Sequence, residues 1–202
     1  MKEAFLARQP GIIGADKCRQ YALLIPLIKE EGMDCMLFEK RARHLRRQPG
    51  EICFPGGKLE PEESYLECAI RETMEELLLM KHQINVIGTG DLYISPFNLM
   101  IHTYIGEIKD YRDTFSVAEV EEVIKVPLDF LREHPPQIYE GKLINEPAED
   151  FPYELIPGGV NYPWAKGSHE VLFYRYEDCI IWGMTAHIVR SVLQLLEEYK
   201  LN

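Results

Sequence analysis

Residues 56–80 read GGKLEPEESYLECAIRETMEELLLM, and this stretch decides the fold. Small and apolar side chains recur in it at helical spacing, which predicts a helix from Ser64 to about Met80. The members of that face are Leu66, Ala69, Ile70, Thr73 and Leu77. The glycine pair that precedes the helix allows positive φ and a close approach of neighbouring backbone.

Three carboxylates gather on another side of the same helix. Glu72 is a neighbour of both Glu75 and Glu76, because residues three and four apart lie side by side on a helix. Their like charges repel, and a helix that accepts this cost usually has a cation to bind. Clustered carboxylate oxygens suit a hard cation, so the pattern indicates a site for Mg²⁺ or Mn²⁺.

An alternative is a solvated acidic face, in which Glu67 and Glu75 pair with Arg71. Two features of the preceding loop favour the metal site instead. The glycine pair allows backbone to approach the helix, and Glu63 stands at the helix start, where the dipole favours a carboxylate.

Short strands and helices are predicted around this central helix. Strands are expected at Tyr21–Ile28, Met33–Glu39, Asn85–Ile94 and Ile101–Ile108, with a hairpin at Val171–Tyr176 and Cys179–Trp182. Helices are expected at Pro127–Glu133, with Pro at the first position, and at Thr185–Tyr199. Val117–Val126 is ambiguous between strand and helix, and residues 134–163 read as a Pro-rich irregular excursion. This order predicts a layered α/β or α+β fold.

The composition is that of an ordinary globular protein, with 202 residues, 46% hydrophobic and 27% charged. We expect one domain, residues 1–202, because no linker or repeat divides the chain. A net charge of −11 argues against a nucleic-acid polymer as partner. The longest apolar stretch is too short to span a bilayer, so no membrane partner is expected.

The cellular compartment is predicted from the cysteines and the N-terminus. The five cysteines are scattered without a C-x-x-C pair, which is typical of free thiols in a reducing compartment. Met1–Arg8 has no apolar core of a signal peptide. A cytoplasmic location is therefore expected, while the oligomeric state, with a homodimer among the options, stays open.

The charged residues around the helix resemble the Nudix box, G-x5-E-x7-R-E-U-x-E-E-x-G-U, where U is a bulky apolar residue. Every charged position of that box is present at the right spacing, beginning at Gly57 and including Glu63, Arg71, Glu72, Glu75 and Glu76. Two positions depart from it. Thr73 stands where a bulky apolar residue is usual, and Leu78 stands where glycine is usual, so the helix is expected to run further before it ends.

The resemblance implies a Nudix fold, a mixed β-sheet between layers of α-helices. It also implies that Mg²⁺ or Mn²⁺ is held by Glu72, Glu75 and Glu76, with the Gly57 carbonyl as a further ligand. The implied role of Arg71 is to hold the carboxylates in place, with Glu63 acting through water. The general base stays open among Glu76, Glu72 and Glu119.

A second resemblance lies upstream of the box. Residues 37–57, LFEKRARHLRRQPGEICFPGG, resemble the signature L-L-T-x-R-S-x3-R-x3-G-x-V-x-F-P-G-G of coenzyme A diphosphatases. Phe38, Glu39 and Ala42 depart from it. The segments Glu119–Leu128 and Trp182–Ala186 also resemble this group, so the likeness extends roughly over residues 21–196.

The implied activity is hydrolysis of coenzyme A or its thioesters at the diphosphate, and the implied partner is a small nucleotide of this type. Arg41 and Arg46 are the expected readers of the 3′-phosphate, since Arg presents a planar fork to phosphate oxygens. Gly56 and Gly57 are expected to contact substrate through their backbone. A solvated basic loop, a Nudix hydrolase for ADP-ribose, NADH or a nucleoside triphosphate, and a non-catalytic Nudix-fold sensor stay open as alternatives.

Overall fold

A mixed sheet of eight strands forms the centre of the protein, whose computed structural model describes residues 6, 8 and 10–199. Its strands are β1 (Arg19–Glu30), β2 (Met33–Arg41), β3 (Ile52–Cys53), β4 (Gly56–Lys58), β5 (Ile84–Thr89), β6 (Tyr93–Ser95), β7 (Leu99–Ile108) and β8 (Val120–Pro127). Strands β1 and β7 pair in parallel, whereas β2 and β4 pair with β1 antiparallel. Met1–Arg8, where the sequence predicts no signal peptide, falls largely outside the described residues.

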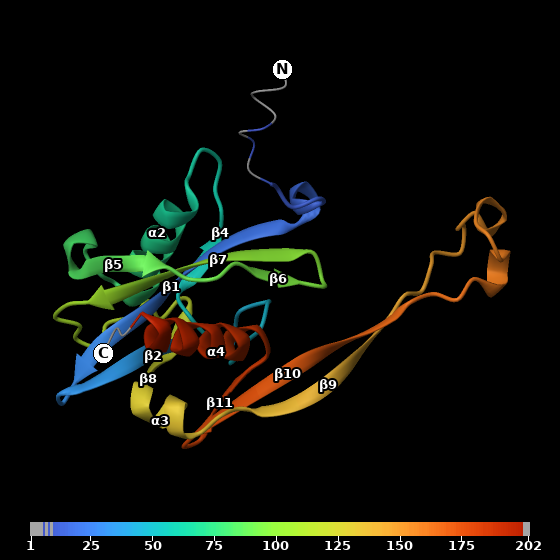
Figure 1. The fold of residues 1–202 in the computed structure, drawn as a ribbon. Helices are drawn as coiled ribbons and strands as arrows, with labels where there is room; N and C mark the ends of the chain where they lie inside the picture. Colours follow the sequence, from blue (N-terminus) through green and yellow to red (C-terminus); the bar gives the residue numbers. More distant parts are fainter. Residues whose placement is uncertain (1–5, 7, 9, 200–202) are drawn as a thin grey trace.

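The sheet lies between helices, as the sequence predicts (Figure 1). Alternation along β2 divides its side chains between two cores. Cys35 and Leu37 pack in the core beneath α2 (Tyr65–Leu77), while Met36 and Phe38 pack in the core that includes α4 (Gly183–Glu198). The chain is therefore a mixed α+β fold with a sheet between helical layers.

The end of α2 differs from the expectation. The helix does not run on to Met80, because Leu78 adopts the left-handed conformation (φ 53°) and the amide of Leu79 bonds back to the Met74 carbonyl. A leucine thus takes the backbone conformation that the box glycine would favour. The buried face also differs: Leu66 is 36% exposed, while Glu76 is 1% exposed and faces the protein interior.

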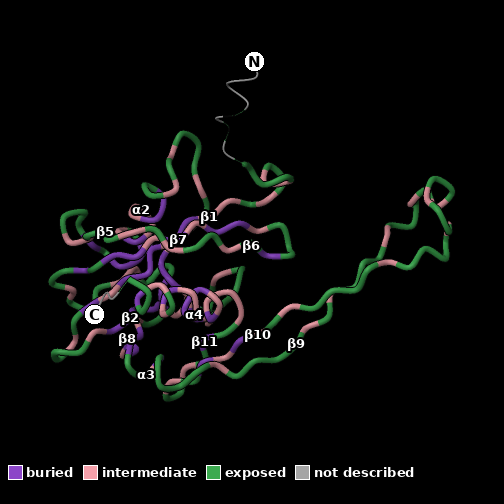
Figure 2. Tube along the Cα trace, in the orientation of Figure 1, coloured by how far each residue is buried: buried purple, intermediate pink, exposed green. Residues whose placement is uncertain are grey.

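A three-stranded sheet of β9 (Gln137–Ile144), β10 (Lys166–Tyr176) and β11 (Cys179–Trp182) follows the short helix α3 (Leu128–Glu133). The predicted β10–β11 hairpin is confirmed. The expectation that residues 134–163 are irregular is wrong for β9, which pairs antiparallel with β10 along its whole length. Together β9 and β10 form a long arm, whose exposed tip projects from the rest of the protein (Figures 1 and 2).

Smaller differences concern element boundaries. The expected strand Asn85–Ile94 is divided into β5 and β6, and the ambiguous segment Val117–Val126 is resolved as strand β8. Pro127 precedes α3 as its N-cap instead of opening it. Short 3-10 helices occupy Ala15–Lys17, Lys81–Gln83, Tyr153–Leu155 and Gly159–Asn161. Within the described residues, no helix combines the length and apolar character needed to cross a membrane.

Candidate active site

The loop from β3 to α2 places two glycines against the helix. Gly56 pairs with Leu23 of β1 and has φ 152°, and a Cβ at this position would collide with the backbone of Ala22. A Cβ on Gly57 would occupy the space of the Glu72 carboxylate. Glycine is therefore required at both positions, because the chain passes between β1 and the carboxylates of α2.

The start of α2 is fixed by a capping box. Ser64 is the N-cap: its hydroxyl accepts a hydrogen bond from the Glu67 amide, and the Glu67 side chain accepts one from the Ser64 amide. The alternative prediction that Glu67 pairs with Arg71 is therefore wrong. Glu67 is occupied by the cap, so Arg71 is left for other carboxylates.

Arg71 lies at the centre of a network of glutamates. It donates two hydrogen bonds to Glu63, one to Glu72 (2.9 Å) and one to Glu75 (3.2 Å). These bonds lower the pKa of Glu63 and raise that of Arg71. Arg71 therefore holds three of the predicted site carboxylates together, which fits the positioning role that the box resemblance implies.

Glu76 points away from this network toward the sheet. Its Oε2 accepts a hydrogen bond from the Gly56 amide at 2.8 Å. Burial, followed by the nearby charge of Glu39, raises the pKa of Glu76 to about 10. Burial also raises the pKa of Glu72, although Arg71 opposes the shift. Both carboxylates are thus held with little water around them.

The loop before β8 brings Glu119 to the same region. The Ser116 amide donates to the Glu76 carbonyl (2.7 Å), and the Glu119 amide donates to the Ser116 carbonyl (3.0 Å). The charge of Glu119 is among the causes that raise the pKa of Glu72 and of Glu76. Glu119 is itself exposed, so it borders the cluster from the solvent side.

The two predicted phosphate-reading arginines differ in exposure and in contacts. Arg41 ends β2 and is half-buried, and its charge lowers the pKa of the buried carboxyl of Glu39. Arg46 is exposed, and no hydrogen bond or ion pair involves its side chain within the described part of the chain. The loop between them is joined to the Glu119 loop by the Ala42 amide, which donates to the Glu119 carbonyl (2.8 Å).

The donor set fits a divalent cation in its chemistry. The side chains of Glu72 and Glu63 are 16% and 13% exposed, and their oxygens are hard ligands of the kind that Mg²⁺ and Mn²⁺ prefer. Yet within residues 10–199, no three His, Cys, Asp or Glu side chains converge as a ready-made metal cage. The reason is visible in the contacts: Arg71 engages Glu72 and Glu75, while the Gly56 amide engages Glu76.

Two parts of the site are not predicted from the sequence. One is the Gly56 amide, whose contact with Glu76 joins separate elements. The other is Glu39 of β2, which is 1% exposed and has one oxygen without a partner among the described residues. Its only sequence signal is a carboxylate inside an apolar strand, at a position where the coenzyme A diphosphatase signature has threonine.

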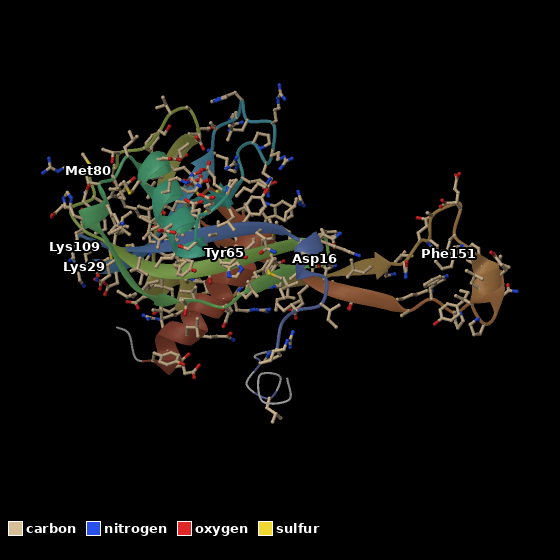
Figure 3. The ribbon with its side chains drawn as sticks, turned by 90° about the horizontal axis from the view of Figure 1, so that it is seen from above. Asp16, Lys29, Tyr65, Met80, Lys109 and Phe151 are labelled. Carbon is tan, nitrogen blue, oxygen red and sulfur yellow. The ribbon has the colours of Figure 1, made fainter. Side chains whose placement is uncertain are left out.

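The site lies beside α2, well away from the β9–β10 arm. Figure 3 shows side-chain oxygens gathered near this helix, whose first residue Tyr65 is labelled, while Phe151 marks the far end of the arm. Phe151 packs with Tyr153 and Trp164 at the arm tip, and no ionisable residue of the Nudix box lies there.

Comparison with known proteins assigns the family. The NUDIX domain family matches residues 19–143. Mouse peroxisomal coenzyme A diphosphatase NUDT7 is 33% identical over 150 residues, which cover 71% of this chain but 63% of the mouse protein. Nudix hydrolase 3 of Caenorhabditis elegans is 33% identical over 198 residues, covering 94% of this chain and 79% of that protein.

A solved structure shows a more distant likeness. The Ap4A hydrolase of C. elegans in a binary complex is 20% identical, with a TM-score of 0.47, over 54% of this chain and 80% of its own. The family match covers more than half of this chain, and hydrolases stand among its relatives. The chain therefore belongs to the Nudix family and is an enzyme of its pyrophosphohydrolase class.

Proposed function

We propose that the protein hydrolyses the diphosphate bond of coenzyme A or its thioesters, releasing 3′,5′-ADP and a 4′-phosphopantetheine product. The observation that carries this proposal is the contact between the signature loop after Arg41 and the Glu119 loop, made by the Ala42 amide. This contact joins the backbone of the coenzyme A signature loop to the loop that carries Glu119, which supports a shared site for the two motifs. A 33% identical mouse relative named coenzyme A diphosphatase supports the same substrate class.

The carboxylates are the proposed holders of a divalent cation, which Nudix hydrolases generally use. Glu72, Glu75 and Glu76, with the Gly57 carbonyl, would hold Mg²⁺ or Mn²⁺. When bound, the ion would neutralise charge on the diphosphate oxygens and orient the attacking water. Burial and the nearby charge of Glu39 raise the pKa of Glu76 to about 10, so a cation that binds there competes with a proton for this carboxyl.

The other box residues act on the carboxylates. Arg71 positions Glu72 and Glu75 by direct hydrogen bonds. Glu63 receives two bonds from Arg71 and in turn fixes the orientation of the guanidinium. For the general base we keep Glu76, Glu72 and Glu119 as candidates. Glu119 differs from the other two in being exposed, so it has free access to bulk water.

Arg41 and Arg46 are proposed to contact different parts of the substrate. Arg41 lies two residues from Glu39 on β2, and its charge lowers the pKa of that buried carboxyl, so we assign Arg41 to the diphosphate. Arg46 is exposed and free of ion pairs among the described residues, so its guanidinium is available to an incoming phosphate. The 3′-phosphate of coenzyme A is the group we assign to Arg46.

A substrate panel tests the proposal directly. Purified protein is incubated with coenzyme A, acetyl-coenzyme A, ADP-ribose, NADH and nucleoside triphosphates, each with Mg²⁺ or Mn²⁺, and products are separated chromatographically. Release of 3′,5′-ADP from coenzyme A supports the proposal, with Glu76→Gln as control for contaminating hydrolases. Turnover of ADP-ribose or NADH with coenzyme A intact would assign another Nudix specificity, and an untouched panel would favour a ligand sensor.

The cytoplasm is the proposed location. All five cysteines are free thiols in the structure, which suits a reducing compartment. Fractionation of cells that express the untagged chain tests this: recovery with a cytosolic marker enzyme is expected, and recovery with an organelle marker would contradict it.

A further inference from the structure

Glu39 is a buried carboxylate that the Nudix box does not include. It lies on β2, where Cys35 and Leu37 face the core beneath α2. Because side chains alternate along a strand, Glu39 continues that face toward α2, whereas Lys40 turns to the other side and pairs with Glu121 and Glu122. Glu39 is 1% exposed, so its carboxyl is withdrawn from bulk water.

The hydrogen bonds of Glu39 are incomplete. Its Oε1 accepts a weak bond from the Cys53 thiol, with sulfur and oxygen 3.4 Å apart. Its Oε2 is fully buried and has no hydrogen-bond partner among the described residues. A buried carboxylate without such partners is costly, because the low-dielectric interior does not replace the lost water. The unpartnered oxygen therefore has capacity to coordinate or accept a hydrogen bond that no described residue uses.

Glu39 and Glu76 both contact the segment from β3 to β4: Glu39 pairs with Cys53 of β3, and the Gly56 amide, three residues further on, donates a hydrogen bond to Glu76. Glu39 is among the causes that raise the pKa of Glu76, while Glu119 and Glu72 act in the same direction on Glu39 itself. Burial raises the pKa of the Cys53 thiol, and the charges of Glu39 and Glu76 raise it further. Glu39 thus lies on the sheet face beneath α2, and its charge interacts with the charges of the box carboxylates.

We propose that Glu39 is an additional ligand of the divalent cation, directly or through one bound water, on the sheet side of the site beside Glu76. The inference rests on the metal-dependent activity proposed above and adds to the box a residue that this chain carries in place of the signature threonine. A cation would satisfy Oε2 and remove the repulsion between Glu39 and Glu76. The competing explanation is a structural role, in which Glu39 only accepts the Cys53 bond.

Metal binding to the substrate-free protein distinguishes these roles. Mn²⁺ is titrated into metal-free wild type and Glu39→Gln, and unbound Mn²⁺ is measured by electron paramagnetic resonance. We expect Glu39→Gln to weaken Mn²⁺ binding about 10- to 100-fold, the usual cost of losing a metal-site residue. Glu122→Gln is the matched control, since Glu122 lies on the adjacent strand β8, is exposed and pairs with Lys40. Its Mn²⁺ affinity should stay within twofold of wild type.

Thermal unfolding gives a second readout that a structural role would move differently. Without metal, Glu39→Gln should unfold at or above the wild-type temperature, because a buried charge has been removed. With Mn²⁺, the wild type should gain more than the variant. Glu39→Thr, which shortens the side chain, is measured in parallel so that the result does not depend on one variant folding.

The outcomes separate this inference from the proposed substrate. Mn²⁺ affinity within twofold of wild type in the Glu39 variants, together with weakened binding in Glu76→Gln, would overturn the ligand role. Equal losses of stability with and without Mn²⁺ would likewise overturn it in favour of the structural role. Weakened Mn²⁺ binding in a protein that leaves coenzyme A intact would support the ligand role and reject the substrate assignment alone.

Discussion

Arg71 donates two hydrogen bonds to Glu63, from Nε to Oε1 at 2.8 Å and from Nη2 to Oε2 at 3.2 Å. The remaining donor capacity of the guanidinium reaches Glu72 and Glu75 on the same helix. A lysine carries the same charge but has no planar fork. The geometry of Arg71, and not only its charge, is therefore what orders the carboxylates.

Arg71→Lys tests this geometric role. We expect kcat/KM to fall about 10- to 100-fold and the Mn²⁺ concentration for half-maximal activity to rise, because a positioning group of the metal site is lost. A metal titration of initial rates measures both quantities. Arg43→Lys is the control, since Arg43 makes an exposed ion pair with Glu121 outside the box. Near wild-type kcat/KM and metal dependence in Arg71→Lys would show that the positive charge alone, and not the fork of Arg71, orders the carboxylates.

Glu76→Gln keeps the shape of the side chain and removes its charge. We expect kcat to fall about 10²- to 10⁴-fold at saturating Mg²⁺, the range for loss of a metal ligand or general base. Rates at several Mg²⁺ concentrations check that the loss is not merely weaker metal binding. Near wild-type turnover would contradict the proposed role of Glu76.

The same variant should change the pH dependence of stability. In the folded protein the pKa of Glu76 is raised from 4.5 to about 10, so folding favours the protonated carboxyl. Metal-free wild type should therefore lose stability as pH rises above about 4.5, while Glu76→Gln should lose less. Urea unfolding in EDTA at pH 5 and pH 8 should show the variant gaining about 1 kcal/mol or more relative to wild type at the higher pH. A constant difference between the two proteins would contradict the buried setting of Glu76.

Arg46→Ala tests recognition of the 3′-phosphate. Coenzyme A and dephospho-coenzyme A differ only in that group, so the variant should lose kcat/KM selectively on coenzyme A. A charge-assisted hydrogen bond of about 1.5–3 kcal/mol corresponds to a loss of roughly 10- to 150-fold. Initial rates on both substrates give the ratio, with Arg43→Ala as a control from the same loop. Equal losses on both substrates would place Arg46 on the diphosphate or in the loop structure instead.

Leu78→Gly tests the strain at the end of α2. Leu78 has φ 53° and is 58% exposed, so the leucine gains little from burial and carries the cost of the left-handed conformation. We expect glycine to stabilise the protein by roughly 0.5–1 kcal/mol in urea unfolding. Leu78→Ala should give no comparable gain, because alanine keeps the strain. Destabilisation by Leu78→Gly would show that Leu78 makes contacts that outweigh its backbone conformation.

Much of the fold is predictable because its signals are local. The periodicity of α2, the alternation along β2 and the turn between β10 and β11 each lie within one short segment. Strand β9 is missed because prolines at positions 135 and 136 precede it and its side chains are mostly exposed. Its order comes from pairing with β10, which is distant in the sequence. No local pattern contains that information.

The site divides in the same way. Glu63, Arg71 and Glu72 can be predicted from the sequence because the box residues lie close together, in one loop and the helix that follows it. Glu39 is invisible to such a pattern, since its position near Glu76 depends on how β2 pairs within the sheet. The end of α2 is mispredicted for another reason. A non-glycine residue at position 78 argues for a longer helix, whereas Thr114 and Ser116, which are distant in the sequence, donate hydrogen bonds to the carbonyls of Leu77 and Glu76 at the helix end.

The parallel pairing of β1 with β7 runs from Arg19 opposite Leu99 to Leu27 opposite Glu107. It has a consequence for folding during synthesis, because the two strands are far apart in the sequence. β2, β4 and α2 all lie within the chain segment that this pairing closes. This pairing joins segments that are distant in the sequence, so it carries a loop-closure entropy cost, and it cannot form before β7 has been synthesised. On the ribosome, a nascent chain without β7 contains the box glutamates but lacks part of the sheet against which α2 packs. Since the hydrophobic core beneath α2 includes residues of both β1 and β7, we expect the candidate site to become ordered only after β7 has been synthesised.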